Sequence, residues 1–142
     1  MIRAPYRSIA RRLLWIAAGL TAIGAAAPLH ADEEHQPRHG GYFGDADDLY
    51  HYELLRENGG VLILYVNDEE NAPLDTKKLR SRWIANGGSL QTKQGEFLPE
   101  ADGSRFVATI PDATDAQPLD VIVAVEKEGV WAEMEFSLPP VS

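Results

Sequence analysis

Cysteine is absent from this chain of 142 residues, and methionine occurs only twice. The missing thiol excludes disulfide bridges, thiolate metal sites and cysteine nucleophiles. A domain of this length can bury enough surface to fold without such cross-links. The fold must therefore be held together by its hydrophobic core.

Long hydrophobic runs are also absent, apart from one uncharged stretch near the N-terminus. Residues 13–29 follow a basic segment and precede the small residue Ala31. This order predicts a secretory signal peptide over residues 1–31; cleavage after Ala27 is an alternative that would leave Pro28 first. Because 17 residues are few for a hydrocarbon core of about 30 Å, an uncleaved anchor helix is the weaker alternative. We expect a periplasmic or secreted protein of a Gram-negative-type envelope, without a stable membrane anchor after cleavage.

Positive charge is scarce in the rest of the chain. Residues 32–142 carry nine basic and 22 acidic residues, which gives a formal net charge of −13. Such a surface repels nucleic acids and anionic lipid headgroups and attracts cations. The composition therefore predicts no nucleic-acid partner.

Helical periodicity is missing as well, and alternation with a period of two dominates from Leu49 onward. We expect strands at the following segments: 49–54, 61–66, 79–85, 89–98, 105–110, 119–126 and 130–138. A helix over residues 75–82 is the weaker alternative for one of them. The pattern predicts a single all-β domain over residues 39–142, an antiparallel, immunoglobulin-like β-sandwich of about seven short strands. A flexible leader, residues 32–38, would precede it, and a small barrel is the alternative architecture.

The first of these strands contains the candidate metal ligands. Tyr50, Tyr52 and Leu54 would face the core, which leaves His51 and Glu53 side by side on the opposite face. The apolar run 61–66 would follow in a hairpin as a central strand covered on both sides.

Imidazole and carboxylate groups are ligands for Zn²⁺, Cu²⁺, Ni²⁺ or Co²⁺. His39 precedes a flexible Gly-Gly pair that could fold it back onto His51 and Glu53. His35, or one of the aspartates of the segment 44–48, could complete the site. Glu53 could instead orient an imidazole as a hydrogen-bond acceptor. The simpler interpretation is that His51 and Glu53 form an ordinary solvated strand face.

Other motifs give weaker signals. The acidic segments 44–48 and 67–71 could hold Ca²⁺ or Mg²⁺ through oxygen atoms, but neither fits an EF-hand, and solvated turns explain both better. No nucleophile elbow, His-Glu-x-x-His motif or phosphate-binding loop occurs, so we predict that the protein is not an enzyme. Trp131 lies on the polar face of its strand, where it could anchor a partner or cover a sheet edge.

The order of these motifs resembles a group of small exported bacterial β-domains. They open with His-Gly-Gly, here His39–Gly41, continue into a strand with His-x-Glu-Leu, here residues 51–54, and pass through a glycine turn into a second strand that ends in Asp, here Asp68. Similar domains occur alone or near the N-terminus of periplasmic adaptor subunits of heavy-metal efflux systems. The resemblance covers roughly residues 39–74 and implies a small β-sandwich linked to metal handling. Glu69 and Glu70 stand where such domains often carry a histidine, which would weaken binding of a borderline metal or shift it to oxygen ligands.

Two functional hypotheses follow from the sequence. The first is a periplasmic accessory domain that binds a divalent transition metal for buffering, delivery or efflux, with a metal ion and a periplasmic efflux component as partners. The alternative is a metal-free envelope module for protein–protein interaction.

Overall fold

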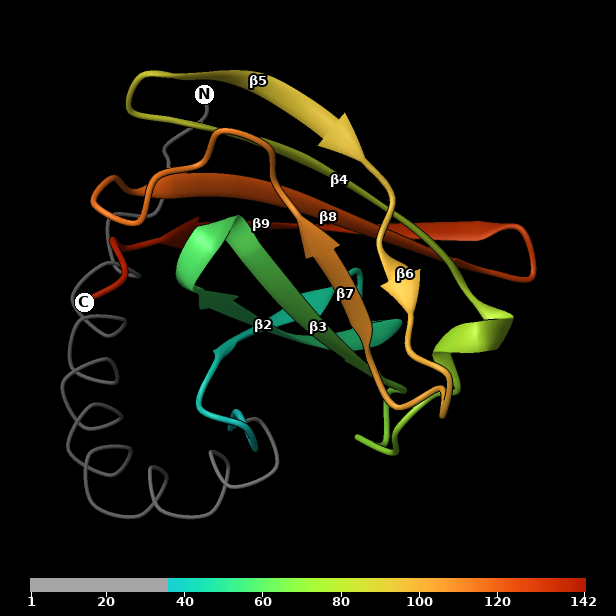
Figure 1. Cartoon of the computed structure of the whole chain (residues 1–142). Coiled ribbons are helices and arrows are strands. Elements are labelled where there is room, and N and C mark those ends of the chain that lie inside the picture. The colour runs from blue at the N-terminus through green and yellow to red at the C-terminus, as the bar shows by residue number, and fades with distance from the viewer. Residues whose placement is uncertain (1–35) are drawn as a thin grey trace, which may run out of the picture. The chain divides into compact units, whose positions relative to one another are not determined.

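The computed structural model describes residues 36–142 (Figure 1). Residues 37–142 form a compact unit. The signal peptide that we predict, most of the leader and His35 lie outside the described residues. Within residues 36–142, no helix is long and apolar enough to cross a membrane.

Within residues 36–142, nine antiparallel strands form two sheets. The larger sheet has the order β1–β2–β3–β7–β6, and the smaller sheet has the order β5–β4–β8–β9. In chain order the strands are β1 (Tyr42–Ala46), β2 (Tyr50–Glu57), β3 (Val61–Asn67), β4 (Arg80–Gly87), β5 (Leu90–Gly95), β6 (Leu98–Pro99), β7 (Phe106–Thr109), β8 (Leu119–Lys127) and β9 (Val130–Leu138). Two short 3₁₀ turns, Asn58–Gly60 and Thr76–Lys78, connect strands.

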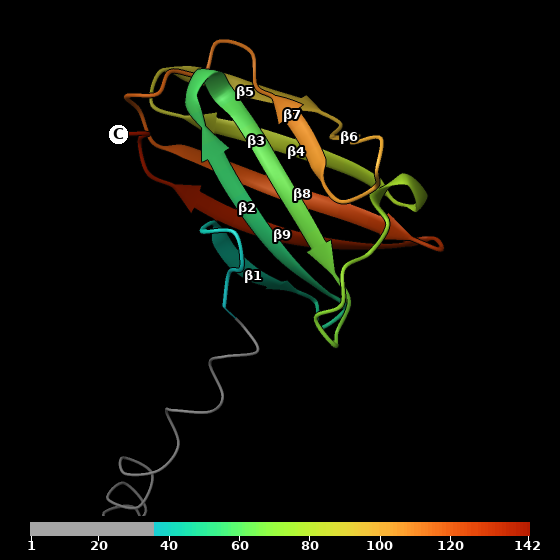
Figure 2. The ribbon, with the colours of Figure 1, turned by 60° about the horizontal axis from the view of Figure 1, so that its bottom comes forward.

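The core lies between the two layers, whose strands cross obliquely (Figure 2). Alternation along each strand sends one set of side chains inward, because successive residues of a strand face opposite sides of its sheet. The larger sheet contributes Tyr52, Leu54 and Leu64 to the core, and the smaller sheet contributes Val121 and Val123. All five side chains are fully buried. This arrangement confirms the predicted β-sandwich.

The predicted hairpin is also confirmed, since β2 pairs antiparallel with β3. The region predicted as a possible helix, residues 75–82, contains only a single 3₁₀ turn before β4 begins. Strand β1 was not expected, because Gly44 and Asp45 within it are typical of turns. Gly44 lies against Met134 of β9, where a Cβ atom would approach the methionine Cε to 2.7 Å. The apparent turn signal is therefore a close contact between the two sheets.

The outer face of β2 differs from the solvated face considered above. His51 and Glu53 point away from the core as expected, yet their exposed fractions are only 8% and 6%. Ile63 of β3, on the same outer face, is 5% exposed. The simple interpretation of His51 and Glu53 as solvated residues is therefore wrong.

Candidate functional site

Glu53 is the centre of a dense polar cluster on the outer face of the larger sheet. Its Oε1 accepts hydrogen bonds from the backbone N–H groups of His39 (2.7 Å) and Gly41 (2.9 Å). Its Oε2 accepts one from the backbone N–H of Arg38 (3.0 Å) and lies 2.8 Å from His39 Nδ1. We call this arrangement of Arg38–Gly41 around the carboxylate the Glu53 cradle. It ties the chain before β1 onto the middle of β2, and Arg38, which we expected in the leader, belongs to it.

The Gly-Gly pair makes this close approach possible. Gly40 has a φ of +80°, which favours glycine. A Cβ atom on Gly41 would lie 2.8 Å from the carbonyl oxygen of Leu54 and equally close to the Leu55 side chain. The His-Gly-Gly motif is therefore explained by backbone geometry at the cradle.

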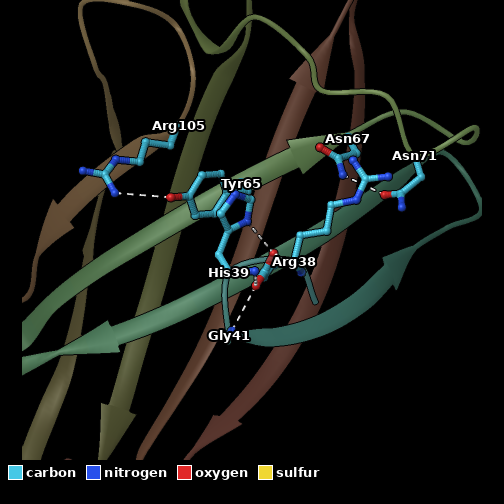
Figure 3. A network of polar contacts seen from close by, with 8 residues as sticks. Arg38, His39, Gly41, Tyr65, Asn67, Asn71 and Arg105 are labelled. Atoms are coloured by element: carbon cyan, nitrogen blue, oxygen red, sulfur yellow. Dashed lines mark hydrogen bonds and ion pairs between the residues drawn. The ribbon is translucent and has the colours of Figure 1, made fainter. Parts of the chain in front are cut away.

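The His39 ring stacks on Tyr65 of β3, with ring centroids 3.6 Å apart and planes 2° from parallel. Figure 3 shows the two rings one over the other, with Arg105 reaching the Tyr65 hydroxyl from the far side. Arg105 Nη1 donates to that hydroxyl (3.3 Å), and Arg105 Nη2 pairs with Glu100 (3.0 Å). The cradle is thus one end of a polar chain that crosses the larger sheet.

Hydrogen bonding decides the ionisation of Glu53. Burial alone would raise the pKa of its carboxyl group, but the donors from Gly41, His39 and Arg38 lower that pKa below its ordinary value overall. A carboxylate that accepts several N–H groups is stabilised in its charged form. Glu53 is therefore a buried, ionised and fully hydrogen-bonded group.

His51 has a different partner. It lies opposite Asp45 of β1, and its Nε2 is 2.9 Å from Asp45 Oδ1. The Phe43 ring packs against it at a centroid distance of 5.3 Å. The side chain is 9% exposed, whereas Asp45 is about half exposed at 46%. This pair is an imidazole–carboxylate contact at the junction of β1 and β2.

The structure thus divides the residues that we considered as a metal site. His39 and Glu53 form one pair, and His51 and Asp45 form another. Within residues 36–142, no group of three His, Asp or Glu side chains is placed to hold a metal ion. Metal binding by His35, His39, His51 and Glu53 stays a prediction, and His35 lies outside the described residues.

A second candidate site lies at one end of the sandwich, between the two sheets. The β1–β2 loop, the loop after β3 and the β8–β9 turn border an open hollow of about 480 Å³, a volume within the roughly 300–1,000 Å³ that is typical of ligand sites. We call it the loop-end hollow. It is lined by Leu49, Tyr50, Asp68, Glu69, Glu70, Lys127, Glu128 and Val130.

Three tight turns hold its walls. Asp47 and Asp48 have φ values of 53° and 55° in the β1–β2 loop, and Glu128 has a φ of 54° in the two-residue β8–β9 turn. In the loop after β3, Asp68 Oδ1 accepts the backbone N–H groups of Glu70 (2.9 Å) and Ala72 (2.8 Å). The hollow is therefore a preformed feature of the loop end.

Two tyrosines of β2 differ sharply near the hollow. Tyr52 is fully buried, and its hydroxyl donates to the carbonyl oxygen of Ala132 at 2.8 Å. Tyr50 is 6% exposed and lines the hollow, yet its hydroxyl makes no hydrogen bond to any of residues 36–142. Burial raises the pKa of Tyr50, and the charges of Glu128 and Glu126 raise it further. The floor of the hollow thus contains a neutral hydroxyl without a protein partner.

The rim of the hollow is acidic. Glu69, Glu70 and Glu128 are exposed, and in the described part of the chain none of their carboxylates forms an ion pair or accepts a hydrogen bond. Lys127 is the single basic residue of the lining. The hollow therefore combines negative charge at its rim with an apolar and aromatic floor.

Trp131 lies on the outer face of the smaller sheet, as predicted. The Arg82 guanidinium lies 4.3 Å from the centre of its ring, and that of Arg80 lies 5.8 Å away. Arg82 also pairs with Glu133 at 3.6 Å. Cation–π contacts of this kind cover the indole, and partner binding by Trp131 stays a prediction.

Sequence reasoning did not identify the hollow. The sequence pattern places Tyr50 in the core and predicts a solvated turn at Glu69 and Glu70. Their only shared signal is that each lies at a chain reversal, and residues 50, 69 and 128 meet only because the turns lie at the same end of the sandwich.

Comparisons with known proteins give a distant structural similarity. No family model matches the chain, and no curated protein matches it. The solved structure "Crystal structure of Br derivative BhCBM56", a carbohydrate-binding module, is similar with a TM-score of 0.48 and 10% sequence identity, over 70% of this chain and 99% of that chain. With a TM-score below 0.5 and 10% identity, this similarity carries no argument about the present chain.

Proposed function

We propose that this protein is a non-catalytic β-sandwich module of the cell envelope that binds its partner at the loop-end hollow. The observation that carries the proposal is Tyr50, a nearly buried side chain whose hydroxyl has no partner among residues 36–142 and lines an acidic hollow. A hydroxyl that lines a concave site and makes no hydrogen bond within the protein is available to a ligand.

The Glu53 cradle is less suited to binding. Four N–H donors already occupy its carboxylate oxygens, and one of them is the His39 side chain. A ligand there would have to displace hydrogen bonds that hold the chain before β1. The cradle is therefore better explained as a stabilising contact.

The Trp131 face is a weaker candidate for a similar reason. Its indole is already covered by Arg82, and Ile84 and Ile122, further along the same face, are each little more than one-third exposed. A partner on this face would gain little newly buried apolar surface.

Site-specific photocrosslinking tests the proposal. Benzoylphenylalanine would replace Val130 at the edge of the hollow or, as the control, Ile122 on the outer face of the smaller sheet; these side chains are 49% and 37% exposed. The full chain would be produced in its native cells and its adducts would be identified by intact mass. We expect a discrete adduct from the Val130 position that is lost when Glu128→Asn is added.

The outcome that contradicts the proposal is equally specific. If the Val130 position gives no adduct while the Ile122 position does, the partner binds the sheet face. If the yield of the Val130 adduct is the same with and without Glu128→Asn, the partner binds near the hollow but not in it.

Binding of a divalent transition metal is the alternative proposal. The observation that favours it is the His51–Asp45 pair, which brings an imidazole nitrogen within 2.9 Å of a carboxylate oxygen. A ligand that binds only the folded state raises the melting temperature. Zn²⁺, Cu²⁺, Ni²⁺ or Co²⁺ should then raise it saturably, and His51→Ala should remove the effect. Equal melting temperatures with each metal and with EDTA would reject this alternative.

A further inference from the structure

We infer that the loop-end hollow binds a primary ammonium group carried on an aliphatic stem, as found in a lysine side chain or a free alkylamine. This inference rests on the proposed function and names the ligand chemistry of the same site. It depends on three features of the hollow, which are its charge, the spread of its carboxylates and the chemistry of its floor.

The charge of the lining selects for a cation. Asp68, Glu69, Glu70 and Glu128 contribute carboxylates, against the single ammonium of Lys127. Carboxylates that border a concave site raise the local concentration of cations and repel anions. Anionic ligands such as phosphates are therefore excluded.

The arrangement of the carboxylates argues against a bare metal ion. Within the described residues 36–142, no three His, Asp or Glu side chains are close enough together to coordinate an ion. Asp68 Oδ1 is already occupied by two backbone N–H groups of its own loop. Glu69 and Glu128 come from turns of different sheets, so their charge is spread along the rim. Spread charge suits an organic cation that fills the hollow.

The floor of the hollow suits an alkyl stem that ends in N–H donors. Leu49, Val130 and the Tyr50 ring provide apolar contact. The Tyr50 hydroxyl oxygen can accept a hydrogen bond, and no group among residues 36–142 supplies one. An ammonium carries three donors and no acceptor, so one can serve this oxygen while the others face the rim carboxylates. A quaternary ammonium has no N–H to offer, and an alcohol has no charge.

The test compares ligands that share one stem. Full-length protein labelled with ¹⁵N would be titrated with hexylamine, 1-hexanol and hexyltrimethylammonium at near-physiological ionic strength, where diffuse charge effects are screened. We expect hexylamine to produce saturable shifts of the backbone amides of Leu49, Glu69 and Glu128. Hexanol should bind at least about tenfold more weakly, because it lacks the charge-assisted contacts.

Variants assign the contacts. Tyr50→Phe removes only the hydroxyl and should weaken hexylamine binding about tenfold, while Glu128→Asn should weaken it about fivefold. The matched control is Glu133→Gln, which removes an exposed carboxylate of the smaller sheet (60% exposed) and should leave affinity unchanged. Equal binding of hexylamine and hexanol, or no effect of Tyr50→Phe, would overturn the inference.

Two further comparisons show whether the ammonium belongs to a protein or to a free amine, and whether a negative result rejects the ammonium inference alone or the proposed site as well. A lysine-containing peptide compared with its Nε-acetylated form distinguishes a protein partner from a free amine, because acetylation removes the charge. If amines fail to bind but the Val130 crosslink persists, the ammonium inference is wrong and the proposed site stands. If both fail, the proposed function is wrong as well.

Discussion

Strand β2 contributes to two regions whose polar side chains differ in their hydrogen bonding. On its outer face, Glu53 is a buried carboxylate whose two oxygens accept four hydrogen bonds from Arg38, His39 and Gly41. Three residues earlier and on the inner face, Tyr50 is equally buried, yet its hydroxyl has no hydrogen-bond partner among residues 36–142. The hydrogen-bonding capacity of Glu53 is therefore used within the protein, whereas that of the Tyr50 hydroxyl is not.

This difference teaches how to weigh conspicuous motifs. The His-Gly-Gly and His-x-Glu elements attract attention because their residue types can bind metals, but the Glu53 carboxylate, His39 Nδ1 and His51 Nε2 already have partners within the protein. The rim of the loop-end hollow looks like ordinary solvated turns in sequence, and the carboxylates of Glu69, Glu70 and Glu128 have no partner among residues 36–142. Unused polar capacity in a concave place is the better guide to binding.

The largest effect should come from breaking the Glu53 cradle. Glu53→Gln leaves backbone N–H groups facing an amide, so buried donors lose their charged acceptor. We expect the free energy of unfolding to fall by about 3 kcal/mol, which lowers the melting temperature by more than about 10 °C. Chemical and thermal unfolding would measure both values.

A matched control is available in the smaller sheet. Glu133→Gln removes a carboxylate that is 60% exposed and 3.6 Å from Arg82, so its effect on stability should stay within about 0.5 kcal/mol. If the two substitutions had similar effects, the cradle would not be the stabilising contact that we describe.

The same carboxylate should give the fold a pH dependence. Burial would raise the pKa of Glu53, but its hydrogen bonds lower it overall, below the ordinary value of 4.5. Between the two values the unfolded state binds more protons, so the free energy of unfolding rises with pH there. The stabilisation is fully present above pH 4.5 and is lost as the pH falls through the lowered pKa. Urea unfolding at a series of acidic pH values should show this slope, reduced in Glu53→Gln.

The two tyrosines of β2 offer the sharpest comparison. Tyr52→Phe removes the buried hydrogen bond from the Tyr52 hydroxyl to the carbonyl oxygen of Ala132, so it should cost about 1.5 kcal/mol of stability. Tyr50→Phe removes a hydroxyl without a protein partner and should change stability by less than about 0.5 kcal/mol. Comparable losses in equilibrium unfolding would mean that Tyr50 has a structural hydrogen bond, which would undermine the proposed site.

The smallest expected effect has the opposite sign. Glu128 has a left-handed φ of 54° and precedes Gly129 in a two-residue hairpin turn, where asparagine is preferred. Glu128→Asn should therefore stabilise the fold by up to about 1 kcal/mol while it weakens ligand binding. A rise in melting temperature with reduced binding would separate function from stability at this position, and a fall would show that the glutamate supports the turn.

Much of the fold could be predicted from local patterns. The alternation from Val130 to Leu138 and the apolar run that begins at Val61 identified two strands correctly, and the hairpin predicted for the second of them is confirmed. Strand β1 was missed, because Gly44 and Asp45 suggest a turn until Met134 is known to pack against that glycine. The burial of His51 and Glu53 was missed as well. Alternation with a period of two predicts on which face of a sheet a side chain lies, but it does not predict what covers that face.

The sequence by itself determined that this is a cysteine-free, acidic β-sandwich and which faces of β2 and β9 point inward, because side-chain direction and hydrophobic burial follow from local order. Only the tertiary structure decided which polar groups would be satisfied. Glu53 meets the backbone 12 to 15 residues before it, whereas Tyr50 shares the hollow with Glu128, 78 positions later in the chain. Hydrogen bonds and charges act over a few ångströms in space, and those neighbours are set by how the two sheets pack.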